Sequence, residues 1–558
     1  MDKTKDRTKI TPTFALCVFT SVFGNAFIFG FNIASVNMPA LMIQKYMRQI
    51  LLERQGKWPP TVLLNGNTSI IEEWNTTISG NTAVTDEPWT STSYSNDSRA
   101  NSSMAEVMTD DIDPAVIELL WAITVAICVL FGMVGAFTSG KIAEKFGRKR
   151  GMIYISILMI IAGILGGITK TVNSFEVLIL SRAFTGLHSG VGMSILPMYL
   201  AEISPKSIRG ATGTFNQLFI TVGILMANIL GLREVFGTED LWPLIFAFNV
   251  IPATFTLIVM PFCPESPRHL LITMKKTDEA ISALRKIRGY NDVSIEIDEM
   301  HMENKESMTS RAMSFKQLLA APELRMPLTI AIVLHVAQQW SGINAVMAYS
   351  SFIFRQASVG EDIISYVILC TGAINLGLTV VTVTLVERVG RRLLLLTSLG
   401  VMALSYVVLT IFLDLQFKDS LADHHTAFAW VCIIDMHIYV IGFALGAGPI
   451  AFLIVPEIFR QEARSTANSI AQSFNWTCNF ILMLSFRFIQ EALGGYTYII
   501  FIVILTLAIT FVYVFVPETK NRTFEEICGL MRSKRPGLMK KSGLLEDQEL
   551  QPMRRRKH

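Results

Sequence analysis

Side-chain amides recur in the apolar stretches of this sequence, where polar groups are costly and often functional. An amide offers two donors and a two-lone-pair acceptor on one uncharged group, which suits adjacent hydroxyl groups that each give and take a hydrogen bond. We therefore expect a neutral, polyhydroxylated ligand. The alternative is that these amides only form hydrogen bonds between helices. Such hydrogen bonds average about 0.6 kcal/mol in membrane proteins. The candidates are Gln217, Gln338, Gln339, Asn344, Asn375 and Asn479.

The rest of the apolar sequence excludes several other kinds of chemistry. It holds no cluster of opposite charges, no metal-spaced set of His and Cys, and no phosphate-binding loop. No nucleophile stands beside a general base, so we expect no enzyme, no cofactor and no metal site. The net charge of +3 gives no patch for nucleic acid. The expected partners are a small neutral molecule and a lipid bilayer.

The elements that must position the amides are long apolar segments. Hydrophobic residues make up 51% of the 558-residue chain and charged residues 17%, whereas about 25% are charged in soluble domains. The sequence predicts an all-α membrane protein, because twelve stretches approach the ~20 residues that cross a bilayer as a helix. These are residues 13–41, 115–138, 151–169, 174–202, 209–232, 242–262, 326–354, 362–386, 393–413, 427–456, 465–489 and 495–516.

The connections predict which side of the membrane each part faces. Short connections at 140–150, 204–209, 387–392 and 460–464 carry twelve basic residues, and those on the opposite side carry five. Cytoplasmic loops are enriched in Lys and Arg, so we place the first set and both termini in the cytoplasm of a multi-pass plasma-membrane protein. The expected parts are an N-terminus (1–12), a six-helix bundle (13–262), a cytoplasmic helical linker (263–325), a second bundle (326–516) and a tail (517–558).

The longest connection on the outer side covers residues 44–113. It is rich in Ser, Thr and Asn and has ten acidic residues against five basic ones. Four Asn-x-Ser/Thr sequons in it suit a glycosylated extracellular loop. They begin at Asn67, Asn75, Asn96 and Asn101.

The chain repeats three charged patterns in the same order. Glu202 and Arg209 flank one connection with a spacing of seven, and Glu457 and Arg464 do so again 255 residues later. GRKR at 147–150 recurs as GRR at 390–392, and PESPR at 264–268 recurs as PETK at 517–520. The repeats predict two pseudo-symmetric six-helix halves.

These charges predict a cytoplasmic latch between the halves. Carboxylates and guanidinium groups at helix ends can pair when that face is closed and must separate when it opens. One exposed pair is worth at most ~1 kcal/mol, but a network can bias a two-state equilibrium. The alternative is that the charges only anchor loops. The latch residues are Arg148, Glu202, Arg209, Glu387, Arg391, Glu457 and Arg464.

At these motifs the chain resembles the major-facilitator sugar porters, in particular the facilitative glucose transporter family. The likeness is carried by GKIAEKFGRKR (140–150), RAFTGLHSG (182–190), PMYLAEISPKSIRG (197–210), PESPR (264–268), QQWSGINAV (338–346), ERVGRR (387–392) and PETK (517–520). A closer likeness to the class II branch, which includes fructose transporters, lies in NIASVNMPALMIQ (32–44), QLFITVGIL (217–225), MAYSSFIF (347–354) and FIQEALGGY (488–496). The resemblance implies hexose transport by alternating access around a site between the bundles.

The resemblance also implies roles for single residues. Gln217, Gln338, Gln339, Asn344 and Asn375 match the family's sugar-binding positions, and Tyr349, Phe443 and Trp476 match aromatic positions that line or close the cavity. Helices seven and ten act as gates by resemblance, and Gly and Pro would let helix ten bend. The gate and hinge residues are Ala348, Gly446, Gly448 and Pro449.

Asn32 stands where proton-coupled sugar symporters of the same superfamily typically have Asp. A carboxylate can gain and lose a proton during transport, whereas an amide cannot. We therefore expect uniport and place Asn32 among the substrate-site residues. Two alternatives stay open, a proton-coupled sugar symporter and a sugar sensor on the same fold. Two intramembrane carboxylates, Glu118 and Asp435, are expected near the outer ends of their helices, within reach of water.

Helix ten divides the substrate prediction between fructose and glucose. Where the glucose-transporting pattern has Glu and Trp, this chain has Ala444 and Phe452, and the same loss is seen in fructose-preferring class II members. QQWSGINAV stays close to the glucose carriers. We lean to fructose, with glucose transported too or instead.

Overall fold

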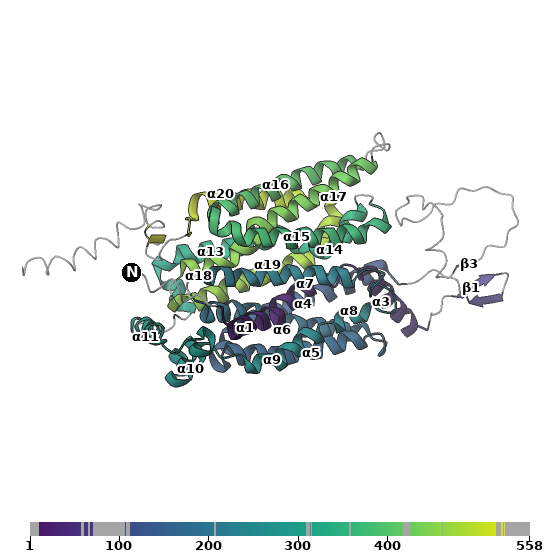
Figure 1. Ribbon diagram of the computed structural model, residues 1–558. Helices are drawn as coiled ribbons and strands as arrows, with labels where there is room; N and C mark the ends of the chain where they lie inside the picture. The colour runs from purple at the N-terminus through teal and green to yellow at the C-terminus, as the bar shows by residue number, and fades with distance from the viewer. Residues whose placement is uncertain are drawn as a thin grey trace, which may run out of the picture.

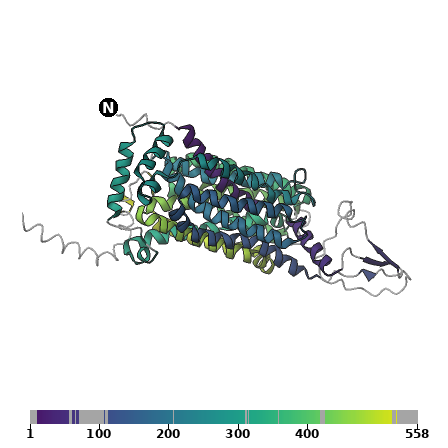
Figure 2. The ribbon, with the colours of Figure 1, turned by 90° about the horizontal axis from the view of Figure 1, so that it is seen from below.

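Long helices lie side by side in the computed structural model (Figure 1). The structure describes residues 10–56, 61–64, 67–70, 106–107, 112–205, 208–308, 313, 315–356, 359–416, 425–459, 461–520, 526–527 and 529. Figure 2, turned by 90°, shows the same elongated bundle. The helices α10 (Thr277–Arg288) and α11 (Ser294–Met308) lie at one end, called the linker end, and α3 (Ala40–Arg54) lies at the other, called the α3 end.

Two helices of the first half begin with side-chain caps. Thr11 accepts a hydrogen bond from the N–H of Phe14 at 3.1 Å, and Asp113 accepts one from Ala115 at 2.9 Å, each with proline at the first helical position. The helices are α1 (Pro12–Val22), η1 (Phe23–Phe27), α2 (Ile28–Ala34), α3, α4 (Pro114–Phe146), α5 (Arg148–Ile168), α6 (Phe175–Ile203), α7 (Arg209–Leu230), α8 (Trp242–Ala247), α9 (Val250–Val259) and η2 (Met260–Phe262).

The second half follows the same order of segments. Its helices are α13 (Pro322–Trp340), α14 (Ile343–Gln356), α15 (Glu361–Val389), α16 (Arg391–Gln416), α17 (His425–Gly442), η5 (Phe443–Ala447), α18 (Gly448–Ile458), α19 (Gln461–Leu493), η6 (Gly494–Tyr496) and α20 (Thr497–Phe515). Between the halves, α4 packs against α19 and α7 against α15.

The connections add short elements at both ends. At the linker end, η3 (His269–Thr273), α10, α11 and α12 (Phe315–Ala320) join the halves, and α10 buries Ala280, Leu284 and Ile287 on one face, as its pattern predicts. The predicted outer connection contains α3 and three short antiparallel strands, β1 (Thr61–Leu64), β2 (Asn67–Ile70) and β3 (Glu106–Val107), in the order β2-β1-β3. These strands were not predicted from the sequence.

Nine helical segments of the described chain are long and apolar enough to cross a membrane. The predicted stretches outside this set correspond to α6, to α13 with α14, and to α19. All three contain polar side chains, among them Arg182 on α6, Gln338 on α13 and Asn479 on α19. The fold class is as predicted, and the count of twelve crossings stays a prediction.

Four predicted spans are interrupted in the structure. The first contains the π-helical turn η1, and the tenth contains the π-helical turn η5. The sixth breaks between α8 and α9, three residues before Pro252, whose missing N–H cannot bond to the carbonyl of Phe248. The seventh breaks between α13 and α14 at Gly342, where φ is +90°. Such irregularities often mark functional positions.

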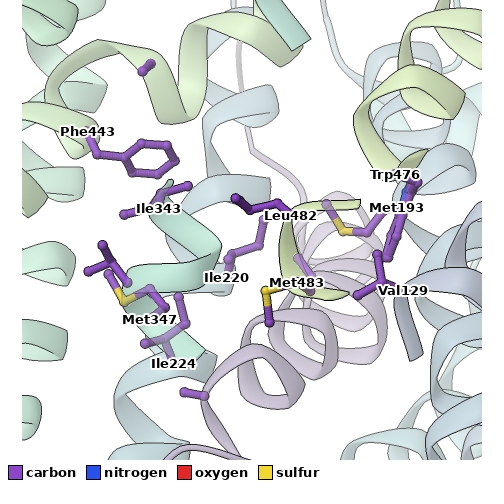
Figure 3. Packing of buried hydrophobic residues seen from close by; sticks show 14 of the residues in the cluster. Val129, Met193, Ile220, Ile224, Ile343, Met347, Phe443, Trp476, Leu482 and Met483 are labelled. Carbon is purple, nitrogen blue, oxygen red and sulfur yellow. The ribbon is translucent and has the colours of Figure 1, made fainter. Parts of the chain in front are cut away.

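The two halves meet along an apolar seam (Figure 3). Ile224 of α7 lies beside Met347 of α14, and α4, which carries Val129, packs against α19, which carries Met483. These side chains are at most 8% exposed. Because the seam is largely apolar and non-directional, it leaves the polar contacts described below to fix how the halves meet.

Candidate functional site

Four amides of the second half form a connected group. Gln338 and Gln339 end α13, Asn344 opens α14, and Asn475 lies on α19. Asn475 Nδ2 donates to Gln338 Oε1 at 2.8 Å, and Gln339 Nε2 donates to Asn475 Oδ1 at 2.8 Å. Asn344 Nδ2 donates to Gln339 Oε1 at 2.6 Å. The structure thus brings together three of the predicted amides through a fourth.

Asn475 is the residue that sequence reasoning missed. It stands four positions before Asn479, so the two amides share one face of α19. That spacing is the signal that would have found it. Asn475 is 5% exposed and contacts both the ring and the backbone carbonyl of His335, with Asn475 Nδ2 3.1 Å from His335 Nδ1.

The other predicted amides are buried outside this group. Gln217 lies on α7, Asn375 on α15 and Asn479 on α19, and no hydrogen bond within the described residues joins them to the four-amide group. The side-chain oxygens of Asn375 and Asn479 have no hydrogen-bond partner in the described part of the chain. Buried acceptors without partners are rare in native proteins, and a hydroxylated ligand would satisfy them.

Two of the predicted aromatic residues are buried near the seam. The Trp476 ring lies 5.6 Å from that of Phe29 on α2, and a Cβ on Gly132 of α4 would come within 2.2 Å of the indole. Trp476 therefore rests on the first half from a helix of the second. Phe443 is 8% exposed, and Figure 3 shows it beside Ile343. The side chains of Tyr349 and Ala348 lie outside the described residues.

Asn32 has its hydrogen-bond partners in the first half. Its Nδ2 donates to Asn249 Oδ1 and to the carbonyl of Ile28, both at 2.8 Å. Arg182 Nη1 donates to Asn32 Oδ1, and Arg182 Nη2 to the Asn32 carbonyl, both at 3.3 Å. The side chain is 4% exposed. This differs from the expectation that Asn32 belongs with the substrate-site amides, because its polar atoms are already used.

The seventh helix turns at Ser341 and Gly342, between the amides Gln339 and Asn344. The Ser341 carbonyl, left over by the break, accepts hydrogen bonds from the hydroxyls of Tyr406 at 2.7 Å and Tyr439 at 2.8 Å. Gly342 has φ of +90°, a backbone angle that residues other than glycine rarely adopt. Gly342 is not among the predicted gate residues, although the Ser-Gly pair inside a helical stretch is a signal for a break.

The tenth helix is irregular at the predicted hinge. The π-helical turn η5 ends at Ala447, and Gly448 and Pro449 open α18. A Cβ on Gly446 would lie 2.5 Å from the carbonyl oxygen of Leu394, so glycine permits the close approach of α16. Gln338 Nε2 donates to the carbonyls of Ala447 at 3.1 Å and Gly448 at 2.8 Å, which ties the amide group to this helix.

Polar contacts close the seam at the α3 end. Asn37, just after α2, donates from Nδ2 to Ser350 Oγ at 2.6 Å, and Ser351 Oγ donates to Asn37 Oδ1 at 2.7 Å. Asn228 Nδ2 donates to the carbonyl of Ile368 at 3.2 Å. Each bond joins the first half to the second. A hydrogen-bonded Asn beside α14 was not among the predicted gate residues.

Replacing Asn37 with alanine is expected to loosen the α3 end. The change removes the side-chain partner of the buried Ser350 hydroxyl, at a cost of roughly 1–3 kcal/mol, and leaves Ser351 with only the Asn37 backbone carbonyl at 3.3 Å. A cysteine placed at Met347, beneath this contact, should then react at least several-fold faster with a membrane-impermeant thiol reagent. Lys45→Ala, which breaks only the exposed ion pair with Glu239 inside the first half, should leave the rate unchanged. Equal rates in both variants would contradict the assignment.

A small cavity lies beneath these contacts. Its volume is about 10 Å³, and its lining comes from both halves, including Ile224, Asn228, Met347, Ser350 and Thr371. Pockets that hold small molecules have volumes of roughly 300–1,000 Å³, so this cavity is too small for a sugar. A ligand of that size requires α14 to separate from α2 and α7.

Charged residues at the linker end form one network in each half. Arg148 Nη2 lies 2.8 Å from Glu202 Oε1, and Arg391 Nη2 lies 3.0 Å from Glu457 Oε1. Both pairs join helices of the same half. This differs from the predicted latch, in which these groups pair between the halves. Each pair joins an arginine and a glutamate of the same copy of the repeated charged patterns.

Two further carboxylates cap the helices that carry these arginines. Glu265 accepts hydrogen bonds from the N–H groups of Arg148 and Lys149, and Glu518 accepts them from Arg391 and Arg392, at 2.9–3.2 Å. The PESPR and PETK repeats thus supply the same cap to α5 and α16. A carboxylate at a helix N-terminus is stabilising because the first N–H groups lack partners within the helix.

Two ionisable groups of this network have shifted pKa values. Burial alone would raise the pKa of Glu518, but backbone N–H bonds from Lys520, Arg391 and Arg392 outweigh it and hold the pKa below its ordinary value. Burial, and then the charge of Arg148, lowers the pKa of His269. Arg148 Nη1 donates to His269 Nδ1 at 2.8 Å, which requires the neutral ring.

The remaining predicted residues are described in part. Arg464 Nη2 donates to the Phe459 carbonyl at 3.2 Å. The side chains of Arg209 and Glu387 lie outside the described residues, as do Asn75, Asn96 and Asn101, and Asn67 is described only as the first residue of β2. Asp435 is 5% exposed and bonded to Ser405, so the expectation that it reaches water is wrong.

Comparison with known proteins identifies the family of this chain. Residues 16–530 match the family described as "Sugar (and other) transporter". The chain is 42% identical over 418 residues, 75% of this chain and 84% of the relative, to the solute carrier family 2, facilitated glucose transporter member 1 of Gallus gallus. It is 36% identical over 526 residues, 94% of this chain and 93% of the relative, to member 5 of Equus caballus.

A solved structure shares the fold. The MFS proton:xylose symporter XylE, bound to 6-bromo-6-deoxy-D-glucose, superposes with a TM-score of 0.70 and covers 93% of this chain and 99% of its own, at 22% sequence identity. The predictions of a transporter rather than an enzyme, and of a multi-pass membrane protein, are confirmed by these likenesses. The chain belongs to the sugar transporter family and, within it, to solute carrier family 2, the facilitated glucose transporters.

Proposed function

We propose that this protein carries a hexose across the membrane by facilitative uniport, through alternating access between its two halves. One observation carries the proposal: the four-amide group between the seventh, tenth and eleventh helices is uncharged. Two further amide oxygens, on α15 and α19, have no hydrogen-bond partner among the described residues. Neutral groups that both donate and accept suit sugar hydroxyls. The relatives named as facilitated glucose transporters support the same substrate class.

Asn32 supports uniport over proton coupling. Its amide fills the place beside Arg182 where the resemblance expects a carboxylate in symporters, and it bonds to both Arg182 and Asn249. An amide keeps the same charge throughout the transport cycle. Sugar then moves down its own gradient.

Alternating access is supported by where the polar contacts lie. The bonds of Asn37 and Asn228 hold the α3 end closed, and they must break for a hexose to enter from that side. We place the linker end, residues 263–325 and both termini in the cytoplasm, and residues 44–113 outside, with glycosylation at one or more of the four sequons. The bundles 13–262 and 326–516 would then rock about the seam, each held rigid by its own charged network.

A proton-coupled mechanism is the second candidate, and one observation favours it. Asp435 on α17 is a buried carboxyl group, and its Oδ2 has no hydrogen-bond partner among the described residues. Ser405 Oγ lies 2.8 Å from both Asp435 Oδ1 and the Asp435 carbonyl. Intramembrane carboxylates are proton-carrying candidates by default.

Replacing Asp435 with asparagine separates the two candidates. The amide keeps the shape and the oxygen that faces Ser405, so uniport predicts hexose uptake within about twofold of the native rate and the same pH profile. Uptake into proteoliposomes between pH 5.5 and 7.5 measures both. Loss of a proton-driven component in the variant would favour coupling through Asp435.

The substrate is tested by uptake of labelled fructose and labelled glucose into proteoliposomes. We propose fructose as a substrate, with glucose transported too or instead. Phe452, which replaces the Trp of the glucose pattern, packs its ring 5.2 Å from His335 beside the amide group. Saturable uptake of either hexose supports the proposal, and uptake of neither contradicts it.

A further inference from the structure

The four-amide group has a fixed direction of hydrogen bonding. Gln338 Nε2 faces the backbone carbonyls of Ala447 and Gly448, at 3.1 and 2.8 Å. A carbonyl oxygen can only accept, so the Gln338 nitrogen must be the atom on this side. Gln338 Oε1 therefore faces the opposite way, toward Asn475.

The direction passes from Gln338 to Asn475 and on to Gln339. Gln338 Oε1 requires a donor, and Asn475 Nδ2 supplies it at 2.8 Å. The same nitrogen lies 3.4 Å from the carbonyl of His335, a second group that can only accept. Asn475 Oδ1 must then accept, and Gln339 Nε2 donates to it at 2.8 Å.

The last link reaches the predicted substrate site. Gln339 Oε1, left as the acceptor, receives Asn344 Nδ2 at 2.6 Å. The Asn344 oxygen and the second N–H of Asn344 Nδ2 remain at the end of this chain of bonds. Asn344 is half-buried, whereas Gln338, Gln339 and Asn475 are at most 6% exposed. A ligand that contacts Asn344 therefore meets an oxygen whose orientation is set by Gln338, three hydrogen bonds back along this chain.

We propose that Asn475 is a positioning residue of a hydrogen-bond relay that runs from the tenth helix through Gln338, Asn475 and Gln339 to Asn344. The relay presents the Asn344 oxygen to the sugar, so the hydroxyl that meets it must donate. The relay starts at the η5–α18 junction of the tenth helix, so a shift of that junction releases Gln338 and alters Asn344. This inference rests on the proposed function, because it assigns a role toward the same hexose.

The relay is tested by non-additivity between residues that do not touch. Among the described residues, the hydrogen bonds join Asn475 to Asn344 through Gln339 and not directly. Independent sites usually show additive free energies. Losing a bond to a positioned neutral group typically costs a factor of about ten in binding. We expect Asn475→Leu and Asn344→Ala each to raise the hexose Kd about tenfold, and the double variant to raise it about tenfold rather than about a hundredfold.

A matched pair lies outside the relay. Gln217→Ala on α7 should combine with Asn475→Leu multiplicatively, giving the product of the two single effects in the same titration of purified protein with D-fructose and D-glucose. Thermal stability is followed in parallel, because a merely structural role would lower Tm and leave Kd unchanged. If Asn475→Leu does not fold, Asn475→Ala takes its place in both pairs.

The outcomes separate the relay from the function on which it rests. A Kd within twofold of the native value in Asn475→Leu, or multiplied effects with Asn344→Ala, overturns the relay while hexose transport stands. Native protein that neither binds nor transports a hexose overturns the proposed function and the relay together. A sub-multiplicative effect confined to the Asn344 pair supports the relay.

Discussion

Replacing Gly342 with alanine is expected to reduce hexose uptake by between about tenfold and a hundredfold. The backbone there has φ of +90°, which costs a residue with a side chain about 1–2 kcal/mol. The new Cβ would also lie 2.5 Å from the Tyr406 hydroxyl, the group that donates to the Ser341 carbonyl. Displacing that hydroxyl loses a bond worth about 1 kcal/mol. Together these two free-energy costs correspond to a loss of uptake of roughly tenfold to a hundredfold.

The control for Gly342 is another glycine of the second half. Gly400 lies within α16 with no atom within 4 Å of the position of its Cβ, so Gly400→Ala should keep uptake near the native rate and slightly favour the helix. Initial rates of labelled hexose uptake, normalised to folded protein, compare the two. Native uptake in Gly342→Ala would show that the break between α13 and α14 does not position the site.

Replacing Asn32 with aspartate is expected to make transport depend on pH. The new carboxylate would face the Arg182 guanidinium, which now donates to the amide oxygen at 3.3 Å. A hydrogen bond between two charged groups is worth about 1.5–3 kcal/mol, so an ionised Asp would hold α2 to α6 more tightly. Burial of this position, 4% exposed, opposes Arg182 by favouring the neutral acid. We therefore expect uptake about tenfold slower at pH 7.5, with partial recovery at pH 5.5 as the carboxylate gains a proton.

A companion variant shows whether the charge is responsible. Asn32→Ala removes the bonds to Arg182 and Asn249 without adding a carboxylate, so its uptake should fall without acquiring a pH profile. The same profile in both variants would mean that the position acts only through packing. The native protein should show no comparable dependence over this range.

The sequence predicts the fold class because length and apolar composition alone decide which segments can cross a bilayer. It indicates the irregular turn of the tenth helix, at Gly446, Gly448 and Pro449, but not the breaks in the other helices. At the seventh helix the decisive feature is Gly342 against Tyr406, a contact between residues 64 positions apart. Local patterns report no such contact. The strands β1 to β3 escaped prediction for the same reason, since pairing depends on partners up to 45 positions away, as between Val62 and Val107.

The candidate site could be predicted by residue type but not by connection. The amides Gln338, Gln339 and Asn344 are evident as polar groups in an apolar stretch, whereas their bonding through Asn475 depends on how α19 packs against α13. The structure differs from the predicted latch for a similar reason, because the pairing of charged groups also depends on how the helices pack. The sequence shows that Arg148 and Arg391 are duplicated, and only the packing shows that each pairs inside its own half.

Transport without proton coupling is measured most directly by the accumulation of sugar at equilibrium. Purified protein in sealed proteoliposomes is given labelled fructose or glucose under an inward proton gradient, and the internal and external sugar concentrations are compared at steady state. Uniport predicts equal sugar concentrations on the two sides, reached at a rate unaffected by collapsing the gradient. Sugar concentrated inside the vesicles, and released when the gradient collapses, would contradict it.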